Sequence, residues 1–124
     1  MLNLDTHILI FALADQLTDR ERRLLSSHRW GISAIVLWEL AKLTQLGRIQ
    51  VELESLAVRR LLSAIEVWPL DLAISLQSTR LDFSSDPADE LIAATSIVHG
   101  VPLLTRDRRI LGSRLVPFAA DALD

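Results

Sequence analysis

The sequence predicts an α/β fold, a three-layer α/β/α sandwich in which helices cover both faces of a central, mainly parallel β-sheet. Short apolar segments alternate with segments of helical periodicity along the chain. The apolar segments are continuous and do not alternate with polar residues, which is typical of strands that are buried on both faces. Strands that alternate with helices in this way form an open parallel sheet.

The first half of the chain begins with an apolar strand at residues 1–4, which stops at Asp5, and continues with a helix at residues 6–14. The elements predicted next are a helix from Thr18-Asp19 to Leu25, a strand at 30–33, a helix at 34–46 that Ser33 caps and Gly47 ends, and an amphipathic helix at 52–65. In the helix that begins at Thr18-Asp19, Glu21, Arg22 and Arg23 are expected on the solvent-exposed face.

The second half of the chain repeats the pattern of strand and helix. Asp86 and Pro87 are typical of a helix start, and Gly100 of a helix end. The predicted elements are a short strand at 67–68 closed by Pro69, a helix at 71–81, a helix from Pro87 to His99, a strand at 101–104, a helical turn at 107–111 and a last strand at 115–118.

Size and composition favour a single domain over residues 1–124, since 124 residues is a usual length for one domain. The absence of cysteine excludes disulfides, thiolate metal sites and a cysteine nucleophile. No secretory signal is visible, and the longest uncharged stretch, residues 91–105, is too short and too interrupted to cross a bilayer. A soluble, cytoplasmic protein without membrane association is therefore expected.

Hydropathy and charge bear on the partners of the protein. Half of the residues are apolar, which is high for a short chain and indicates that a partner covers some apolar surface. The net charge of −3 argues against nucleic-acid binding through a broad basic face. That objection weakens if a cation neutralises several of the acids. In addition, all of the 13 basic residues except Lys42 are arginines, whose side chains suit phosphate contacts.

Four acids are expected to meet at the edge where the strands end and the helices begin, which is where open parallel sheets bind ligands. Asp5 follows the first strand, Asp89 lies in the first turn of the helix that Asp86-Pro87 opens, and Asp107 follows the strand at 101–104. Glu39 lies six positions after Ser33, about 9 Å along a helix axis, and is expected to point in beneath the same edge.

Four converging carboxylates would repel one another unless a cation lay among them. Because the donors are all oxygens, the expected ion is Mg²⁺ or Mn²⁺. Such an ion activates water and stabilises phosphate charge, so hydrolysis of a phosphodiester is the expected reaction. Thr6, Ser33, Thr105 and nearby helix N-termini would donate hydrogen bonds to phosphate oxygens.

Each acid also has a purely structural interpretation. Asp5 and Asp107 are equally well explained as helix N-caps, and for Asp86 the capping interpretation is favoured. Because Asp86 would serve as the cap, Asp89 is the better metal ligand. Glu39 could form a surface pair with Lys42, but its apolar neighbours favour a functional role.

The other candidates are less specific. Structural roles are favoured for His7, beside Asp5, for His28 and His99 as helix C-caps, and for Trp30, Trp38 and Trp68 as core or interface anchors. A group of arginines near Asp107 is equally well explained as RNA-phosphate contacts or as a solvated face: Arg106, Arg108, Arg109 and Arg114.

Four short blocks in this order resemble the PIN-domain family, and within it the VapC-type toxins of bacterial toxin-antitoxin pairs. The blocks are Leu4-Asp5-Thr6-His7, then Ser33 with Trp38-Glu39, then Asp86-Pro87-Ala88-Asp89 with Ile92-Ala93-Ala94, and Thr105-Arg106-Asp107. The resemblance covers essentially the full length. One departure is Glu90, where related sequences often have arginine, so the phosphate contact expected there is in doubt.

The resemblance implies a PIN-like α/β/α fold and an endoribonuclease that depends on Mg²⁺ or Mn²⁺. It also implies a homodimer and inhibition by a cognate VapB-type antitoxin. The family's acids fall on Asp5, Glu39, Asp89 and Asp107 as catalytic and metal-binding residues, with Thr6, Ser33, Asp86 and Thr105 as accessory positions.

Three other functions were compared with this one. A phosphoacceptor signalling domain needs a lysine after a late strand, and Lys42 is the sole lysine. A phosphatase with two aspartates separated by one residue is excluded because position 7 is histidine. A non-catalytic PIN-like module that binds RNA or a protein remains open. Unchanged toxicity and RNA binding in Asp5→Ala would support it.

Overall fold

The structure, a computed structural model, describes residues 1–120. Strands and helices alternate along these residues as predicted. In chain order they are β1 (Leu2–Leu4), α1 (Thr6–Leu13), α2 (Asp19–Ser26), β2 (Trp30–Ser33), α3 (Ala34–Gln45), α4 (Leu56–Ser63), β3 (Glu66–Trp68), α5 (Leu72–Ser78), α6 (Pro87–His99), β4 (Leu103–Leu104) and α7 (Arg108–Leu111).

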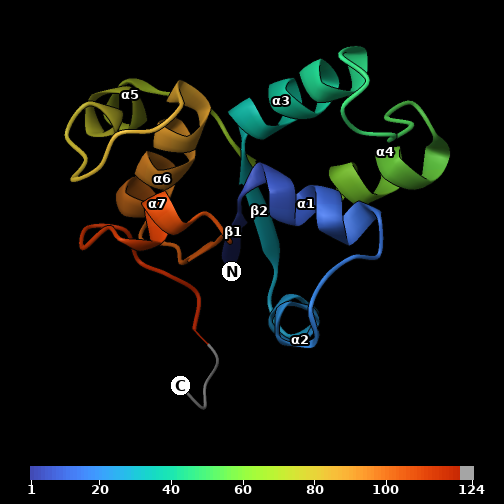
Figure 1. Cartoon of the computed structure of the whole chain (residues 1–124), viewed down its shortest axis with the longest axis horizontal. Helices are drawn as coiled ribbons and strands as arrows, with labels where there is room; N and C mark the ends of the chain where they lie inside the picture. Colours follow the sequence, from blue (N-terminus) through green and yellow to red (C-terminus); the bar gives the residue numbers. More distant parts are fainter. Residues whose placement is uncertain (121–124) are drawn as a thin grey trace.

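The strands form one parallel sheet in the order β3-β2-β1-β4. Figure 1 shows helices on both faces, with α1 to α4 on one side of the strands and α5, α6 and α7 on the other. The predicted α/β/α fold with a parallel sheet is therefore confirmed. Because β1 is flanked by β2 and β4, the residues that follow these three strands lie at one edge of the sheet.

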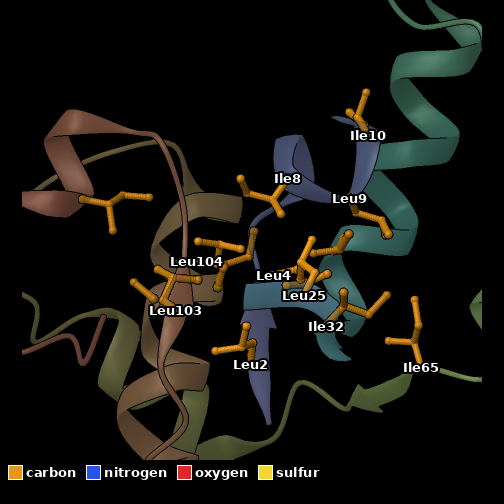
Figure 2. Packing of buried hydrophobic residues seen from close by; sticks show 14 of the residues in the cluster. Leu2, Leu4, Ile8, Leu9, Ile10, Leu25, Ile32, Ile65, Leu103 and Leu104 are labelled. Carbon is orange, nitrogen blue, oxygen red and sulfur yellow. The ribbon is translucent and has the colours of Figure 1, made fainter. Parts of the chain in front are cut away.

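The core lies on both faces of the sheet and consists of strand residues with the helix residues that cover them. Leu4 and Ile32 from the strands and Leu9 from α1 have no exposed surface. Figure 2 shows these side chains together, with Leu103 and Leu104 of β4 packed beside them. β1 and β4 are buried at every residue, as expected of parallel strands that helices cover on both faces.

One close approach in the sheet requires glycine. A Cβ atom on Gly31 would lie 2.3 Å from the ring of Trp68 on the neighbouring strand β3. Trp68 is buried, and its ring stacks on His99 with 5.4 Å between the ring centroids. Gly31 thus allows β2, β3 and the end of α6 to pack together.

Two helices are shorter than predicted. The predicted helix at 52–65 begins only at Leu56, because the Ser55 hydroxyl accepts a hydrogen bond from the backbone N–H of Val58 and caps the helix there. The predicted helix at 71–81 ends at Ser78, with Asp71 as its N-cap. The hydroxyl of Thr79 bonds back to the Leu76 carbonyl at this end, as hydroxyl side chains near helix ends often do.

The last predicted strand, at residues 115–118, is reduced to a bridge between Phe118 and Leu103. Pro117 has no N–H to donate to a ladder, and the pairing consists of Leu103 N–H to the Pro117 carbonyl and Ala119 N–H to the Leu103 carbonyl. The strand predicted at 101–104 is likewise shorter and begins at Leu103, after Pro102.

The surface carries several large apolar side chains. Leu72 is 72% exposed, Leu56 63% and Trp38 58%. Trp38 is therefore not a core residue, whereas Trp68 is. The role of Trp38 as an interface anchor stays a prediction. Among residues 1–120, no helix is long and apolar enough to cross a membrane.

Candidate active site

Asp5 lies where β1 ends and α1 begins. The Asp5 N–H donates to the carbonyl of Leu104 at 3.1 Å, which places Asp5 beside the residue that follows β4. That residue, Thr105, donates its hydroxyl hydrogen to Asp5 Oδ2 at 2.6 Å. The other oxygen, Oδ1, is buried and has no hydrogen-bond partner among the described residues. Asp5 occupies the N-cap position of α1 but accepts no capping hydrogen bond, so the capping interpretation of its side chain is wrong.

Glu39 lies on α3 and faces the start of α1. Its Oε1 accepts a hydrogen bond from the Thr6 hydroxyl. Burial raises the pKa of the Glu39 carboxyl; the Thr6 hydrogen bond and His7 oppose this rise, and the charges of Asp5 and Asp86 add to it. The alternative surface pair does not form, because the Lys42 ammonium bonds to Gln45 Oε1 at 2.9 Å.

Asp89 lies in the first turn of α6, on the opposite face of the sheet from α1 and α3 (Figure 1). Its Oδ2 accepts a hydrogen bond from the Ser85 hydroxyl at 2.9 Å. Burial raises the pKa of Asp89 from 3.8 to about 6; the Ser85 hydrogen bond opposes the rise, and the charges of Asp5, Glu39 and Asp107 add to it. Asp89 is thus electrostatically coupled to the other three predicted acids.

Asp107 caps α7, as the structural interpretation predicted. Its Oδ1 accepts hydrogen bonds from the N–H groups of Arg109 at 2.8 Å and Ile110 at 3.4 Å. The Asp107 N–H in turn donates to the Thr105 hydroxyl oxygen at 3.0 Å, which ties Asp107 to the residue that orients Asp5. Capping uses one carboxylate oxygen and leaves Oδ2 available for another ligand.

The arrangement suits a hard cation in its chemistry but is not a closed metal site. Within residues 1–120, no three acidic or histidine side chains approach closely enough to hold one ion as they stand. The donors are all oxygens, and Asp5 Oδ1 is a buried acceptor without a donor. An unpaired buried carboxylate oxygen beside other acids is costly unless a cation compensates it. The residues therefore fit Mg²⁺ or Mn²⁺ in charge and donor type.

The accessory residues Asp86 and Ser33 differ in their hydrogen bonds. Asp86 is the N-cap residue of α6, but its side chain makes no capping hydrogen bond, so the favoured capping role is wrong. Its charge instead acts on Glu39, which keeps it a candidate accessory acid. Ser33 is fully buried and caps α3, its hydroxyl oxygen accepting from the Ile35 N–H at 3.3 Å.

Arg106 forms an ion pair with Glu21 and is still partly exposed, so a contact of Arg106 with RNA phosphates stays a prediction. Its Nε and Nη2 donate to the two carboxylate oxygens of Glu21 at 2.8 and 2.7 Å, and its guanidinium lies 3.8 Å from the centroid of the Phe11 ring. Glu21 is only 5% exposed, so its predicted place on the solvent-exposed face of α2 is wrong. The pair fastens the segment between Thr105 and Asp107 to α2.

The remaining predicted residues lie on the surface. Arg108, Arg109 and Arg114 are exposed, as is His7. The Arg114 backbone N–H donates to Asp82 Oδ2 at 2.7 Å. No described contact tests whether these side chains bind RNA. His28 bonds through Nδ1 to the Leu24 carbonyl at 2.7 Å, as expected for a residue at a helix C-terminus.

Sequence reasoning missed two supporting residues. Asn3 is fully buried on β1 and donates from Nδ2 to the Ile92 carbonyl at 3.1 Å and to Ser96 Oγ at 2.9 Å, which joins β1 to α6. Ser85 orients Asp89. A polar residue inside an otherwise apolar strand was a signal for Asn3. No sequence signal distinguished Ser85 from an ordinary cap residue.

Comparisons with known proteins agree with this geometry. The family model of the PIN domain matches residues 3–112. Ribonuclease VapC22 from Mycobacterium tuberculosis is 35% identical over 86 residues, which cover 67% of this chain and 66%, just under two thirds, of that protein.

Solved structures share the fold at low sequence identity. The crystal structure of VapBC2 from Rickettsia felis bound to a DNA fragment from their promoter superposes with a TM-score of 0.73 at 19% identity, covering 96% of this chain and 98% of that one. A toxin-antitoxin complex from Klebsiella pneumoniae gives 0.71 at 20% identity, covering 90% and 91%. FitAcB from Neisseria gonorrhoeae gives 0.66 at 23% identity, covering 96% and 97%. Because the family model spans most of the sequence, from Asn3 to Gly112, this chain belongs to the PIN-domain family.

Proposed function

We propose that the protein is an endoribonuclease that hydrolyses phosphodiester bonds in RNA with the help of Mg²⁺ or Mn²⁺. Two observations carry the proposal: the charges of Asp5, Glu39 and Asp107 all act on Asp89, and Asp5 Oδ1 is buried without a hydrogen-bond partner among residues 1–120. Carboxylates arranged in this way suit a divalent cation beside a phosphate. The 35% identity to a ribonuclease from Mycobacterium tuberculosis supports RNA as the substrate.

Asp5, Glu39, Asp89 and Asp107 would hold the ion, with Asp86 as an accessory acid. When bound, the ion supplies activation of water and compensation of phosphate charge. Binding also removes the cost of bringing the carboxylates together, because opposite charge favours their ionised forms.

The hydroxyl residues orient the acids. Thr105 binds Asp5 Oδ2 and so leaves Oδ1 directed to other ligands, while Thr6 binds Glu39 Oε1 and Ser85 binds Asp89 Oδ2. Each acid thereby keeps one carboxylate oxygen for the ion. In the metal-free protein, burial and the neighbouring acids raise the pKa of Asp89 to about 6.

In the cell the protein would act as a growth-inhibiting toxin that a VapB-type antitoxin neutralises. The structural relatives from Klebsiella pneumoniae and Rickettsia felis are toxin-antitoxin or VapBC assemblies, which supports a partner of this kind. A homodimer would cover exposed apolar residues such as Trp38 and Leu72. An RNA substrate and an antitoxin partner imply action in the cytoplasm.

Purified protein incubated with a fluorescent single-stranded RNA and Mg²⁺ tests the proposal. We expect cleavage that EDTA abolishes, and a loss of at least about 100-fold in rate for Asp5→Asn and Glu39→Gln with the fold intact by circular dichroism. Asp15→Asn is the control, because the Asp15 side chain is 93% exposed and asparagine tolerates its positive φ of 54°. Full activity in Asp5→Asn would refute the assignment and favour a non-catalytic binding module.

A further inference from the structure

A groove of about 640 Å³ lies beside the acidic site, between α1 and α3. Figure 1 shows these helices side by side, with the segment that joins α3 to α4 at the far end of α3. The groove is lined by residues that include Ile10 and Phe11 of α1, Leu43 of α3, and Arg48 and Ile49 of the joining segment. This volume is in the range of protein sites that hold small ligands, about 300 to 1,000 Å³. We call it the α1/α3 groove.

The α1/α3 groove is continuous with the acidic site. Glu39, one of the four acids proposed to bind the ion, and the accessory acid Asp86 form part of its wall. A substrate held at the acids therefore has an adjoining channel along α1 for its next residues.

Arg48 places a free positive charge in the groove. Its side chain is exposed and makes no hydrogen bond or ion pair with any other residue in the range 1–120, in contrast to Arg106. The Arg48 backbone N–H bonds to the Leu43 carbonyl at 2.9 Å, which closes the turn after α3 and fixes where the side chain begins. An unpaired guanidinium is suited to a forked contact with a phosphate.

We propose that the α1/α3 groove binds the nucleotides that adjoin the cleaved phosphodiester of a single-stranded RNA, with Arg48 on a backbone phosphate and the apolar wall against a base. This inference rests on the proposed ribonuclease function. A nucleic-acid strand alternates negative phosphates with apolar base faces, and the groove offers a positive group and apolar side chains in the same space. The side-chain amides of Gln16 and Gln50 add donors and acceptors at its rim.

RNA affinity in EDTA tests the groove without relying on catalysis. A fluorescein-labelled single-stranded RNA of mixed sequence is titrated with protein by anisotropy, and a gel verifies that the RNA stays intact. We expect Arg48→Gln to weaken binding about 5- to 10-fold, as loss of one charge-assisted contact does. The slope of log K against log salt should fall by about 0.7, the value for one phosphate contact on a single strand.

Two matched controls separate the groove from general charge effects. Arg29→Gln removes an exposed arginine just before β2, at the opposite edge of the sheet, and should leave affinity and slope unchanged. Gln50→Glu adds a negative charge in the groove and should weaken binding, whereas Gln45→Glu on α3, outside the groove, should not. With cleavage measured in Mg²⁺, Arg48→Gln should raise KM about 5- to 10-fold and change kcat less than 2-fold.

Equal affinity and slope for Arg48→Gln and Arg29→Gln would overturn the proposal. So would unchanged RNA binding together with weaker binding of a VapB-type antitoxin, because the groove would then belong to a protein partner. Absence of cleavage by the wild-type protein in Mg²⁺ would refute the proposed function. A loss of RNA affinity in Arg48→Gln, measured in EDTA, would still support RNA binding in the groove.

Discussion

Replacing Asp89 by asparagine should stabilise the metal-free protein at neutral pH. Asp89 titrates at about 6 in the folded protein, above its ordinary 3.8, because burial and neighbouring acids disfavour its charge. At 1.36 kcal/mol per pKa unit this difference corresponds to about 3 kcal/mol. Since the side chain is only half-buried, solvent screening reduces the expected gain to about 1 kcal/mol, or about 3 to 6 °C in Tm.

The pH dependence gives the prediction its sign. A carboxyl whose pKa is raised by folding favours the folded state fully below its unfolded pKa of 3.8, and this contribution is lost as the pH rises through about 6. In EDTA, the difference in unfolding free energy between Asp89→Asn and wild type should be near zero at pH 4 and reach its full value above pH 7. Glu39, whose pKa is also raised, changes the stability in the same direction.

Urea denaturation in EDTA at pH 4.5, 6 and 7.5 measures this difference, with Glu54→Gln as a control for removal of an exposed acid. Millimolar Mg²⁺ should reverse the order, because the ion stabilises the wild type by mass action and the variant has lost a ligand. The reasoning would be refuted if Asp89→Asn were less stable than wild type at pH 7.5 in EDTA, or if the gap did not change with pH.

Three further substitutions test the supporting contacts. Glu21→Gln should cost about 1 to 2 kcal/mol in urea denaturation and loosen Arg106, because it removes the buried carboxylate from a partly buried ion pair; an unchanged midpoint would contradict this role. Asn3→Ala should cost about 2 to 3 kcal/mol, since the Ile92 carbonyl and Ser96 hydroxyl lose their buried donor, and a loss below about 0.5 kcal/mol would show that water replaces it. Gly31→Ala should cost at least about 2 kcal/mol and change the tryptophan fluorescence, because its Cβ would meet Trp68 at 2.3 Å; wild-type fluorescence would count against the close approach.

The order of the elements, and the sheet edge at which Asp5 and Thr105 lie, could be predicted because both depend on periodicity and on parallel topology. Asp5 and Thr105 are 100 positions apart, yet the end of β1 and the end of β4 must lie together once the strands pair in parallel. Asp107, two positions after Thr105, follows the same strand β4 and lies at the same edge.

Contacts that depend on side-chain direction could not be predicted. The residue type and spacing of Glu21 are typical of a solvent-exposed helix face. Its burial is explained only by the approach of Arg106, 85 positions away in the sequence. Asp86 and Asp89 are both acids at a helix start, and local sequence does not show that the Asp86 side chain makes no capping bond or that Asp89 accepts from the Ser85 hydroxyl. The groove that includes Arg48 likewise arises from the packing of α1 against α3 and leaves no local signal.

The most direct test is anomalous diffraction from crystals of the protein grown with Mn²⁺. A peak about 2.1 Å from Asp5 Oδ1, and at similar distance from at least one oxygen of Glu39, Asp89 or Asp107, is the predicted result. Millimolar Mn²⁺ that leaves no peak beside Asp5, or that binds only elsewhere on the protein, would contradict the claim that these acids come together to hold a divalent ion.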